Sequence, residues 1–305
     1  MVQRRFRVSS LLLTAAFAAA GVGFTATHAR AAMTPIGVSG FNQDSVVENT
    51  YIYSAAAVPA NIALWLSPNS GTTGPHNTFY EAGLNGSPAG SGLPVSHLLT
   101  STYDGSTVFQ FQHYTNTNND LLLTFANTAN NGAPLGSNGA SGTLTLSTPA
   151  AYSSLAVLAN STDGNAALAD AVTLNFANGV TATTDISTPD WFDNTASGTT
   201  PGGNSYGTAT GGLGRVALSG GGYSGTPNDP VLTQTTINLA NLGGVNYTGD
   251  TLDSLTFSAP AFPVGTDIWA VSGAATPAIP EPSTLAAVAL GCLGMMGLRR
   301  KRRTA

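Results

Sequence analysis

Cysteine is almost absent from this sequence of 305 residues, which contains only Cys292, inside an apolar segment near the C-terminus. This scarcity excludes a disulfide framework, a thiolate metal site and a cysteine nucleophile from the rest of the chain. The part between the two ends must therefore be held together by an ordinary hydrophobic core. Its roughly 249 residues are enough to form one.

Positive charge is equally scarce between Ala32 and Pro280, where the only Lys or Arg is Arg215. The same stretch contains fourteen of the fifteen acidic residues, so its formal net charge is −13. A surface of this kind repels phosphate groups, which excludes nucleic acid as a partner. The other nine basic residues lie near the two ends: Arg4, Arg5, Arg7, Arg30 and Arg299–Arg303.

The N-terminus has the three parts of a secretory signal peptide. A start rich in arginine precedes the apolar run Leu11–Gly23, and the small-x-small site at Ala29 and Ala31 follows it. A helical signal peptide over residues 1–31 predicts export through the Sec translocon and cleavage beside Ala31. The alternative, an amphipathic N-terminal helix, is disfavoured because the run is apolar all round.

The C-terminus carries a second targeting signal. The apolar run Leu285–Leu298, together with residues 282–284, reaches about 25 Å as a helix. We expect a short transmembrane helix, near the lower limit for crossing a bilayer. The positive-inside rule places the basic residues that follow in the cytoplasm, so the body lies outside. These residues, a topological stop, are Arg299, Arg300, Lys301, Arg302 and Arg303.

A Pro-Glu-Pro-Ser-Thr motif at residues 280–284 leads into the apolar run and the basic residues. This order of parts resembles the PEP-CTERM sorting signal of Gram-negative bacteria, over residues 280–303. The resemblance implies an inner-membrane intermediate, cleavage at or near the motif by an exosortase-type transpeptidase, and a final place at the cell surface or in an extracellular polysaccharide matrix. The alternative is a plain anchor helix, which also leaves the body outside. In either case the helix is the only expected contact with the membrane. The motif residues are Pro280, Glu281, Pro282, Ser283 and Thr284.

Short runs that alternate apolar and polar residues predict β-strands in the body. The clearest pair, Ala171–Phe176 and Val180–Ile186, flanks Asn178–Gly179, which favours a hairpin with a type I′ turn. The other expected strands are Thr107–Tyr114, Leu121–Phe125, Gly142–Leu146, Ser154–Ala159, Thr235–Leu239, Ser254–Ser258 and Ile268–Val271.

Many short strands separated by Gly, Asn and Ser favour an all-β fold. We expect a single β-sandwich over residues 32–273 and a linker over residues 274–280. Two Gly-rich segments, 198–214 and 220–230, are expected to be surface loops. Trp65 and Trp269 lie in apolar runs and are expected in the core.

The body also resembles secreted jelly-roll domains of the galactose-binding-like type. The similarity lies in Tyr152–Phe192 and in the final expected strand, Asp267–Gly273. It implies a jelly-roll topology and a role in glycan binding, in scaffolding or in both, but it identifies no binding residue.

Glycan binding requires an aromatic face beside groups that form hydrogen bonds. The best such cluster is Asp190, Trp191 and Phe192, and Arg215 is a further candidate contact. The alternative, which the sequence favours, is that Trp191 and Phe192 close the end of the sandwich. If Trp191 is fully buried, the glycan site expected here is wrong. Two tyrosines from the expected loops are also candidates: Tyr206 and Tyr223.

Calcium is the one metal ion that the sequence suggests. Asp163 and Asn165 lie in a turn, and Asp170 follows, so their side-chain oxygens suit a hard cation. Clusters of Asn, Asp and Gly are more often plain turns, and no other cofactor is expected. Weaker candidates are Asp104, Asp250 and Asp253.

The sequence contains no recognisable catalytic signature. It has no G-x-S-x-G, and His76, His97 and His113 have no partner motif. The stretch Gly212–Ala217 formally matches a dinucleotide fingerprint, but no strand is expected before it and no helix after it. We therefore expect an exported, non-enzymatic protein that binds or scaffolds extracellular polysaccharide. The alternative is a secreted polysaccharide-degrading enzyme, since paired carboxylates are defined by their separation in space.

Overall fold

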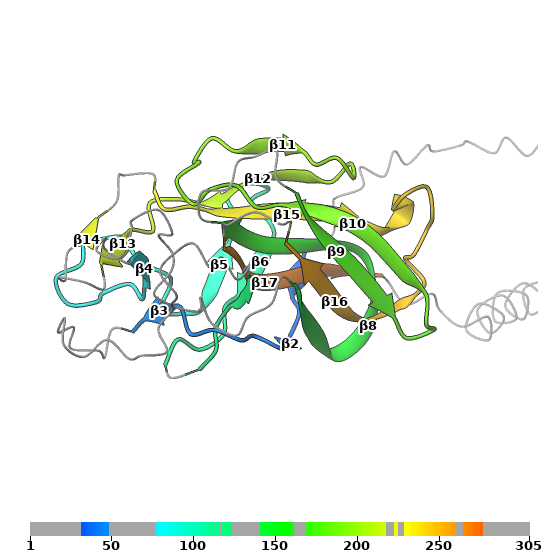
Figure 1. The fold of residues 1–305 in the computed structure, drawn as a ribbon, viewed down its shortest axis with the longest axis horizontal. Helices are drawn as coiled ribbons and strands as arrows, with labels where there is room; N and C mark the ends of the chain where they lie inside the picture. The colour runs from blue at the N-terminus through cyan, green and yellow to red at the C-terminus, as the bar shows by residue number, and fades with distance from the viewer. Residues whose placement is uncertain are drawn as a thin grey trace, which may run out of the picture. The chain divides into compact units, whose positions relative to one another are not determined.

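The computed structural model describes residues 32–48, 77–115, 117–123, 141–161, 169–217, 223–224, 229–259 and 265–276. The chain divides into two units, Met1–Ala31 and Ala32–Ala305, and all described residues belong to the second. The expected all-β class is confirmed, because strands dominate the described part and its one helix is the short 3-10 turn Leu239–Asn241 (Figure 1). The strands are β1 (Thr34–Pro35), β2 (Val38–Ser39), β3 (Val46–Val47), β4 (Asn77–Tyr80), β5 (Leu98–Thr100), β6 (Val108–Gln110), β7 (Leu121–Leu123), β8 (Ser141–Ser161), β9 (Ala169–Phe176), β10 (Thr181–Ser187), β11 (Ser197–Thr199), β12 (Ser205–Thr210), β13 (Arg215–Ala217), β14 (Tyr223–Ser224), β15 (Leu232–Asn238), β16 (Thr251–Ser258) and β17 (Thr266–Ala275).

The long strand β8 joins the two layers of the main sheet. Its first half pairs with β16 and β2, and its second half pairs with β15 and β17. The register against β16 shifts between Leu252 and Ser254, where β8 bends. Pro149, which has no amide hydrogen to donate, lies exposed in this bend. The two strands that the sequence predicts here are therefore halves of one bent strand.

The main sheet curls through β8 so that its two halves face each other. One layer has the order β10-β9-β16-β8-β2, and the other has β11-β12-β15-β8-β17, with β1 and β7 on the far side of β17. Apolar side chains from both halves, including Leu144, Leu174, Val157 and Ile237, form one core between them. The expected sandwich is thus two layers of a single curled sheet.

Burial patterns distinguish the two layers. β9 and β16 largely alternate between buried and partly exposed residues because one face of their layer meets solvent. β15 and β17 are buried on both faces. The second face of their layer packs against Phe79, Phe109 and other residues of β3–β6, and Trp269 lies at the centre of this second core. The core position predicted for Trp269 is confirmed, while Trp65 lies outside the described residues.

The β9–β10 hairpin confirms the strongest local prediction, but its turn differs from type I′. Phe176 accepts a hydrogen bond from the Gly179 amide (2.9 Å) and donates one to the Val180 carbonyl (3.0 Å). Among the turn residues only Gly179 has a positive φ, of 80°. A type I′ turn needs positive φ at both central residues. The hydrogen bonds instead match a type I turn followed by a Gly bulge.

Three further expectations are corrected by the strand boundaries. β17 runs through Ala275, so the body ends later than residue 273. Segment 198–214, expected to be a surface loop, contains most of the β11–β12 hairpin at the edge of the sheet. The strand expected over Thr107–Tyr114 ends at Gln110, and beyond it Tyr114 is buried while His113 is exposed.

The predicted signal-peptide helix and C-terminal membrane helix both lie outside the described residues. Within the described ranges, no helix has the length and apolar character needed to span a bilayer.

Candidate functional site

The structure brings together the four residues that the sequence suggests for glycan contact. The guanidinium carbon of Arg215, on β13, lies 4.4 Å from the ring centroid of Phe192 and 5.8 Å from that of Trp191. Asp190 contributes a negative charge that acts on Arg215. We call Asp190, Trp191, Phe192 and Arg215 the Arg215 ledge.

Trp191 supports the ledge from beneath. Its side chain is 3% exposed, and its ring packs edge-on against Phe79, with centroids 5.3 Å apart. Its amide donates to the Ser161 carbonyl (2.9 Å), and its carbonyl accepts from the Val231 amide (2.7 Å). Trp191 is therefore part of the second core, and its indole is not an open surface for a sugar ring. This burial overturns the glycan site as the sequence predicted it, with Trp191 as an exposed sugar-stacking surface, and agrees with the buried alternative that the sequence favours.

Phe192 and Asp190 are half-buried and belong to one turn. The Asp190 carboxylate accepts a hydrogen bond from the Phe192 backbone amide (3.0 Å), which holds the Asp190 side chain against the turn. Burial lowers the pKa of Arg215, and the charge of Asp190 acts in the opposite direction. An Arg guanidinium remains protonated in proteins. The ledge therefore presents a fixed cation on an aromatic support, next to a carboxylate.

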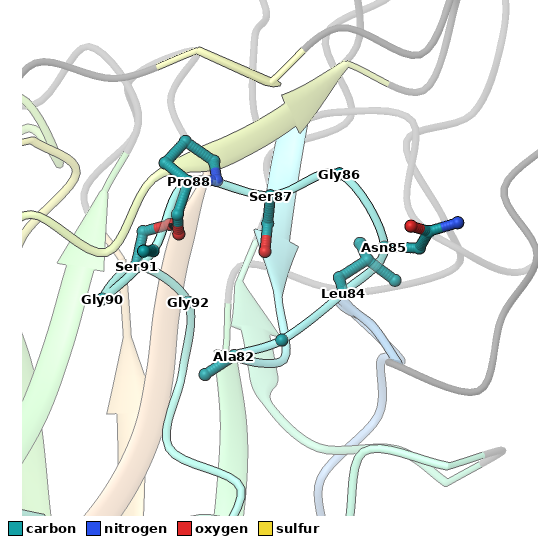
Figure 2. A pocket seen from close by; sticks show the side chains of 11 residues that line it. Ala82, Leu84, Asn85, Gly86, Ser87, Pro88, Gly90, Ser91 and Gly92 are labelled. Atoms are coloured by element: carbon teal, nitrogen blue, oxygen red, sulfur yellow. Dashed lines mark hydrogen bonds between the residues drawn. The ribbon is translucent and has the colours of Figure 1, made fainter.

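A hollow of about 420 Å³ lies inside the loop formed by residues 82–92 (Figure 2). The ends of the loop meet, because the Ala82 amide donates to the Leu93 carbonyl (2.8 Å) and the Leu93 amide to the Tyr80 carbonyl (2.7 Å). Such a closed, self-packed loop is an Ω-loop. Its lining has no charged side chain, and Figure 2 shows Ser87 directed into the ring and Asn85 directed away.

The hollow adjoins the segment that leads into Arg215. The Gly92 amide donates to the Leu213 carbonyl (2.6 Å), and the Tyr80 and Ser91 hydroxyls lie 2.6 Å apart. Gly214 has a φ of +68°, and a Cβ there would lie 2.4 Å from the Tyr80 hydroxyl. The close approach of the two segments therefore requires glycine at this position.

The two tyrosines expected in loops have structural roles. Tyr206 lies on β12 and is 7% exposed, so it is not a surface contact. Tyr223 lies on β14, its ring packs edge-on against Tyr80, and its hydroxyl donates to the Asn85 carbonyl (2.6 Å). Tyr223 thereby holds the outer wall of the hollow.

A buried carboxyl cluster was not predicted from the sequence. Asp120 and Asp267 are fully buried and within hydrogen-bond reach of each other. Ser45 donates to Asp120 (2.9 Å), and the Asn160 amide group donates to Asp267 (3.3 Å). Burial, and for Asp120 also the adjacent charge of Asp267, raises the pKa of both carboxyls well above the usual range. Because the pair is closed to solvent, it does not present an acid and a base to a substrate.

The calcium candidates are only partly described. Asp163 and Asn165 lie outside the described residues. Asp170 is fully buried, accepts a hydrogen bond from Thr188 (2.8 Å), and has its pKa raised to about 6 by burial. Asp104 caps a turn by accepting hydrogen bonds from the backbone amides of residues 106 and 107. Within the described ranges, no group of three or more His, Cys, Asp or Glu side chains is placed to hold a metal ion.

The match to a known protein family lies in the C-terminal tail. No curated protein matches the chain. The family model of the PEP-CTERM protein-sorting motif matches residues 278–303, which include the motif Pro280–Thr284 and the basic stop Arg299–Arg303. Both segments lie outside the described residues. The chain is therefore an exported protein of a Gram-negative bacterium that carries a PEP-CTERM sorting motif and is sorted through the membrane by an exosortase-type enzyme.

Proposed function

We propose that the body is a non-enzymatic binding module for neutral extracellular polysaccharide, acting through the Arg215 ledge and the adjoining hollow. The observation that carries the proposal is the placement of Arg215. The sole cation between residues 32 and 280 is held across the ring of Phe192 and beside Asp190.

The chemistry of the ledge suits sugar hydroxyls. A guanidinium offers five N–H donors in a fixed plane, and stacking on an aromatic ring limits its rotation. The neighbouring carboxylate of Asp190 supplies acceptors. Phe192 then orients Arg215, a different role from the sugar-stacking surface expected from the sequence. The uncharged lining of residues 82–92 provides further hydrogen-bonding groups close to the ledge.

The charge of the body favours an uncharged glycan. Fourteen acidic residues against one Arg repel a polyanion over most of the surface. The proposal also includes export of the protein through the Sec translocon. Its final location would be the cell surface or the extracellular matrix.

Replacing Arg215 with alanine tests the ledge. We expect Arg215→Ala to lower the affinity for a bound neutral glycan by about tenfold or more, because a charged hydrogen bond contributes about 1.5–3 kcal/mol. Binding of the purified protein to an array of neutral and acidic glycans, with and without EDTA, measures this. Arg215→Lys is the matched control, since it keeps the charge and loses the planar group. Unchanged binding by Arg215→Ala rules out the ledge, and binding retained in EDTA rules out calcium at this site.

The sorting motif predicts a specific mature terminus. Mass spectrometry of the protein recovered from the outside of its host should find a chain that starts near Ala32 and ends near Pro282. The basic residues 299–303 should be absent from it. Replacing Pro280 and Pro282 with alanine should leave the uncut tail on the protein, because the recognition motif is lost. A wild-type protein that keeps residues 285–303 would contradict the processing expected here.

A further inference from the structure

Two histidine rings lie against each other beside the β5–β6 hairpin. His97 directly precedes β5, and His113 follows the end of β6 by three residues (Figure 1). The centroids of the two rings are 4.9 Å apart, and their planes meet at 64°. The Phe111 amide donates to the His97 carbonyl (2.8 Å), which extends the ladder of the hairpin and brings the two histidines within reach of each other. We call His97 and His113 the histidine pair.

His97 has an uncommon backbone conformation. Its φ is +57°, and every other residue with a positive φ in the described part of the chain is glycine. The left-handed conformation brings Cβ too close to the following carbonyl oxygen, so it costs stability in any residue but glycine. A turn holds His97 there, because its amide donates to the Pro94 carbonyl (2.9 Å). Strained residues of this kind cluster at active sites and ligand clamps, so the conformation points to a role for the side chain.

The ring of His97 has a buried nitrogen without a hydrogen bond. Nδ1 is closed to solvent and makes no hydrogen bond with any residue that the structure describes. The ring packs against Tyr114, with centroids 4.4 Å apart, and the buried Tyr114 donates to the Pro94 carbonyl (3.2 Å). Leaving a buried polar atom unpaired is unfavourable. A metal ion satisfies such a nitrogen, and neutral imidazole is the commonest metal ligand in proteins.

The distance between the two rings fits two ligands of one metal ion. A histidine nitrogen lies about 2.0–2.1 Å from zinc, which places the centre of its ring about 3.2 Å from the ion. Two such rings with centroids 4.9 Å apart subtend an angle of about 100° at the ion. This angle lies between those of a square-planar and a tetrahedral site, at about 90° and 109°. Among the described residues no third His, Cys, Asp or Glu joins the pair, so water completes the coordination.

We propose that the histidine pair binds one divalent transition-metal ion of the class that imidazole prefers, which includes Cu²⁺ and Zn²⁺. Ca²⁺ and Mg²⁺ prefer oxygen ligands and do not suit the pair. The net charge of −13 between residues 32 and 280 attracts cations, and the charge of Glu81 acts on Tyr114, beside His97. The bound ion ties the turn that begins at Pro94 to the segment after β6. This inference is independent of the Arg215 ledge.

Titration with Cu²⁺ and with Zn²⁺ tests the pair, by isothermal calorimetry on protein purified without a polyhistidine tag. We expect one ion per chain and tighter binding of Cu²⁺ than of Zn²⁺. His97→Asn introduces a residue that tolerates a positive φ, and His113→Gln changes an exposed side chain. Each variant should weaken binding by about 10–100-fold or more, since even the loss of an outer-shell partner has an effect of this size. His76→Ala is the matched control and should bind as the wild type does.

Electron paramagnetic resonance of the Cu²⁺-loaded protein identifies the ligands. The wild type should show coupling to two imidazole nitrogens, and His113→Gln should show coupling to one. Zn²⁺ should also raise the Tm of the wild type, because it binds the folded state, and should leave the Tm of His113→Gln unchanged.

Several results would overturn the inference. They are a wild type that binds neither ion, binding that both variants leave unchanged, and Ca²⁺ that competes equally with Zn²⁺. A loss in His76→Ala as large as that in His113→Gln overturns a site formed by the pair alone. Thermal unfolding shows whether each variant is folded, and if His97→Asn fails to fold, His113→Gln decides the result.

The ledge variant separates this inference from the proposed function. Arg215→Ala should keep the full affinity for Cu²⁺ and Zn²⁺, and His113→Gln should keep the affinity for glycan. Loss of glycan binding in Arg215→Ala with intact metal binding therefore supports both proposals. Loss of metal binding in Arg215→Ala overturns a metal site that is independent of the ledge.

Discussion

Trp269→Ala is expected to lower the free energy of unfolding by about 3–5 kcal/mol, because it deletes the largest fully buried side chain of the described residues. The indole packs edge-on against Phe79 with centroids 5.3 Å apart, and Phe111 lies 6.3 Å away. Its N–H also donates to the Asn160 side-chain carbonyl (2.5 Å). The substitution therefore opens a cavity in the second core and leaves a buried acceptor without its donor. Urea unfolding followed by tyrosine fluorescence or circular dichroism measures the change.

Trp269→Phe separates these two contributions. It retains an aromatic ring beside Phe79 and removes the N–H that Asn160 accepts, so we expect a smaller loss of about 1–3 kcal/mol. Asn160 also donates to Asp267 through its amide group. Loss of the indole donor should therefore loosen the buried carboxyl pair as well. Equal losses for the two variants would show that packing contributes little at this position.

Local chemistry made part of the fold predictable. The β9–β10 hairpin follows from alternation on both sides of Asn178–Gly179, and the core position of Trp269 follows from its apolar neighbours. The bend of β8 was missed because the polar, Pro-containing stretch around Pro149 looks like a break between two strands. Segment 198–214 was missed for a related reason: its Gly, Thr and Ser are typical of loops, and pairing with β15 is what makes β12 a strand.

The candidate site was predictable in composition but not in arrangement. The sequence indicated Asp190, Trp191, Phe192 and Arg215, and the structure places them together. The sequence favoured a buried Trp191, but it could not indicate that Trp191 packs against Phe79 or that Arg215 covers Phe192, because both contacts join segments that are distant in the sequence.

The buried carboxyls had a weaker signal in the sequence. Acidic side chains are almost never fully buried unless they are paired, so the sequence offered no reason to expect two of them in the core. Asp120 and Asp267 each lie directly beside an expected strand, and that position was the available clue. What brings them together is the pairing of β7 with β17, which are separated by more than a hundred residues.

The second large expected effect is a change of stability with pH. It is expected because four buried carboxyls have raised pKa values. Burial raises the pKa of Asp44 and of Asp170 to about 6, and it raises those of Asp120 and Asp267 as well. No Lys is available in the body, and its one Arg lies on the ledge. In the unfolded chain each Asp titrates near pH 4. Between about pH 4 and pH 7 the folded protein therefore holds protons that the unfolded chain has lost.

Stability should fall as the pH rises through this window, since the folded state binds more protons there. Asp170 alone accounts for about 3 kcal/mol from its shift of about two pKa units, and the other three carboxyls act in the same direction. Asp104 acts in the opposite sense. Burial disfavours its ionised form, but hydrogen bonds from Thr107 and Gln234 outweigh this and lower its pKa to about 2. Its contribution is lost only as the pH falls from about 4 toward 2, so maximum stability is expected near pH 4.

Asp120→Asn tests the origin of this dependence. The amide keeps an acceptor for Ser45 and supplies an N–H to Asp267, so it replaces the shared proton without a charge. We expect the variant to be more stable than the wild type at pH 7.5 by about 1–3 kcal/mol and nearly equal to it at pH 4.5. Urea unfolding at both pH values measures the difference. Equal effects at the two pH values would contradict a carboxyl pair that retains a proton in the folded state. The gain at neutral pH is expected because the wild type has two unfavourable options. It must either keep one of the two buried carboxyls protonated at a pH where a carboxyl in water is ionised, or bury two adjacent negative charges with no Lys or Arg beside them.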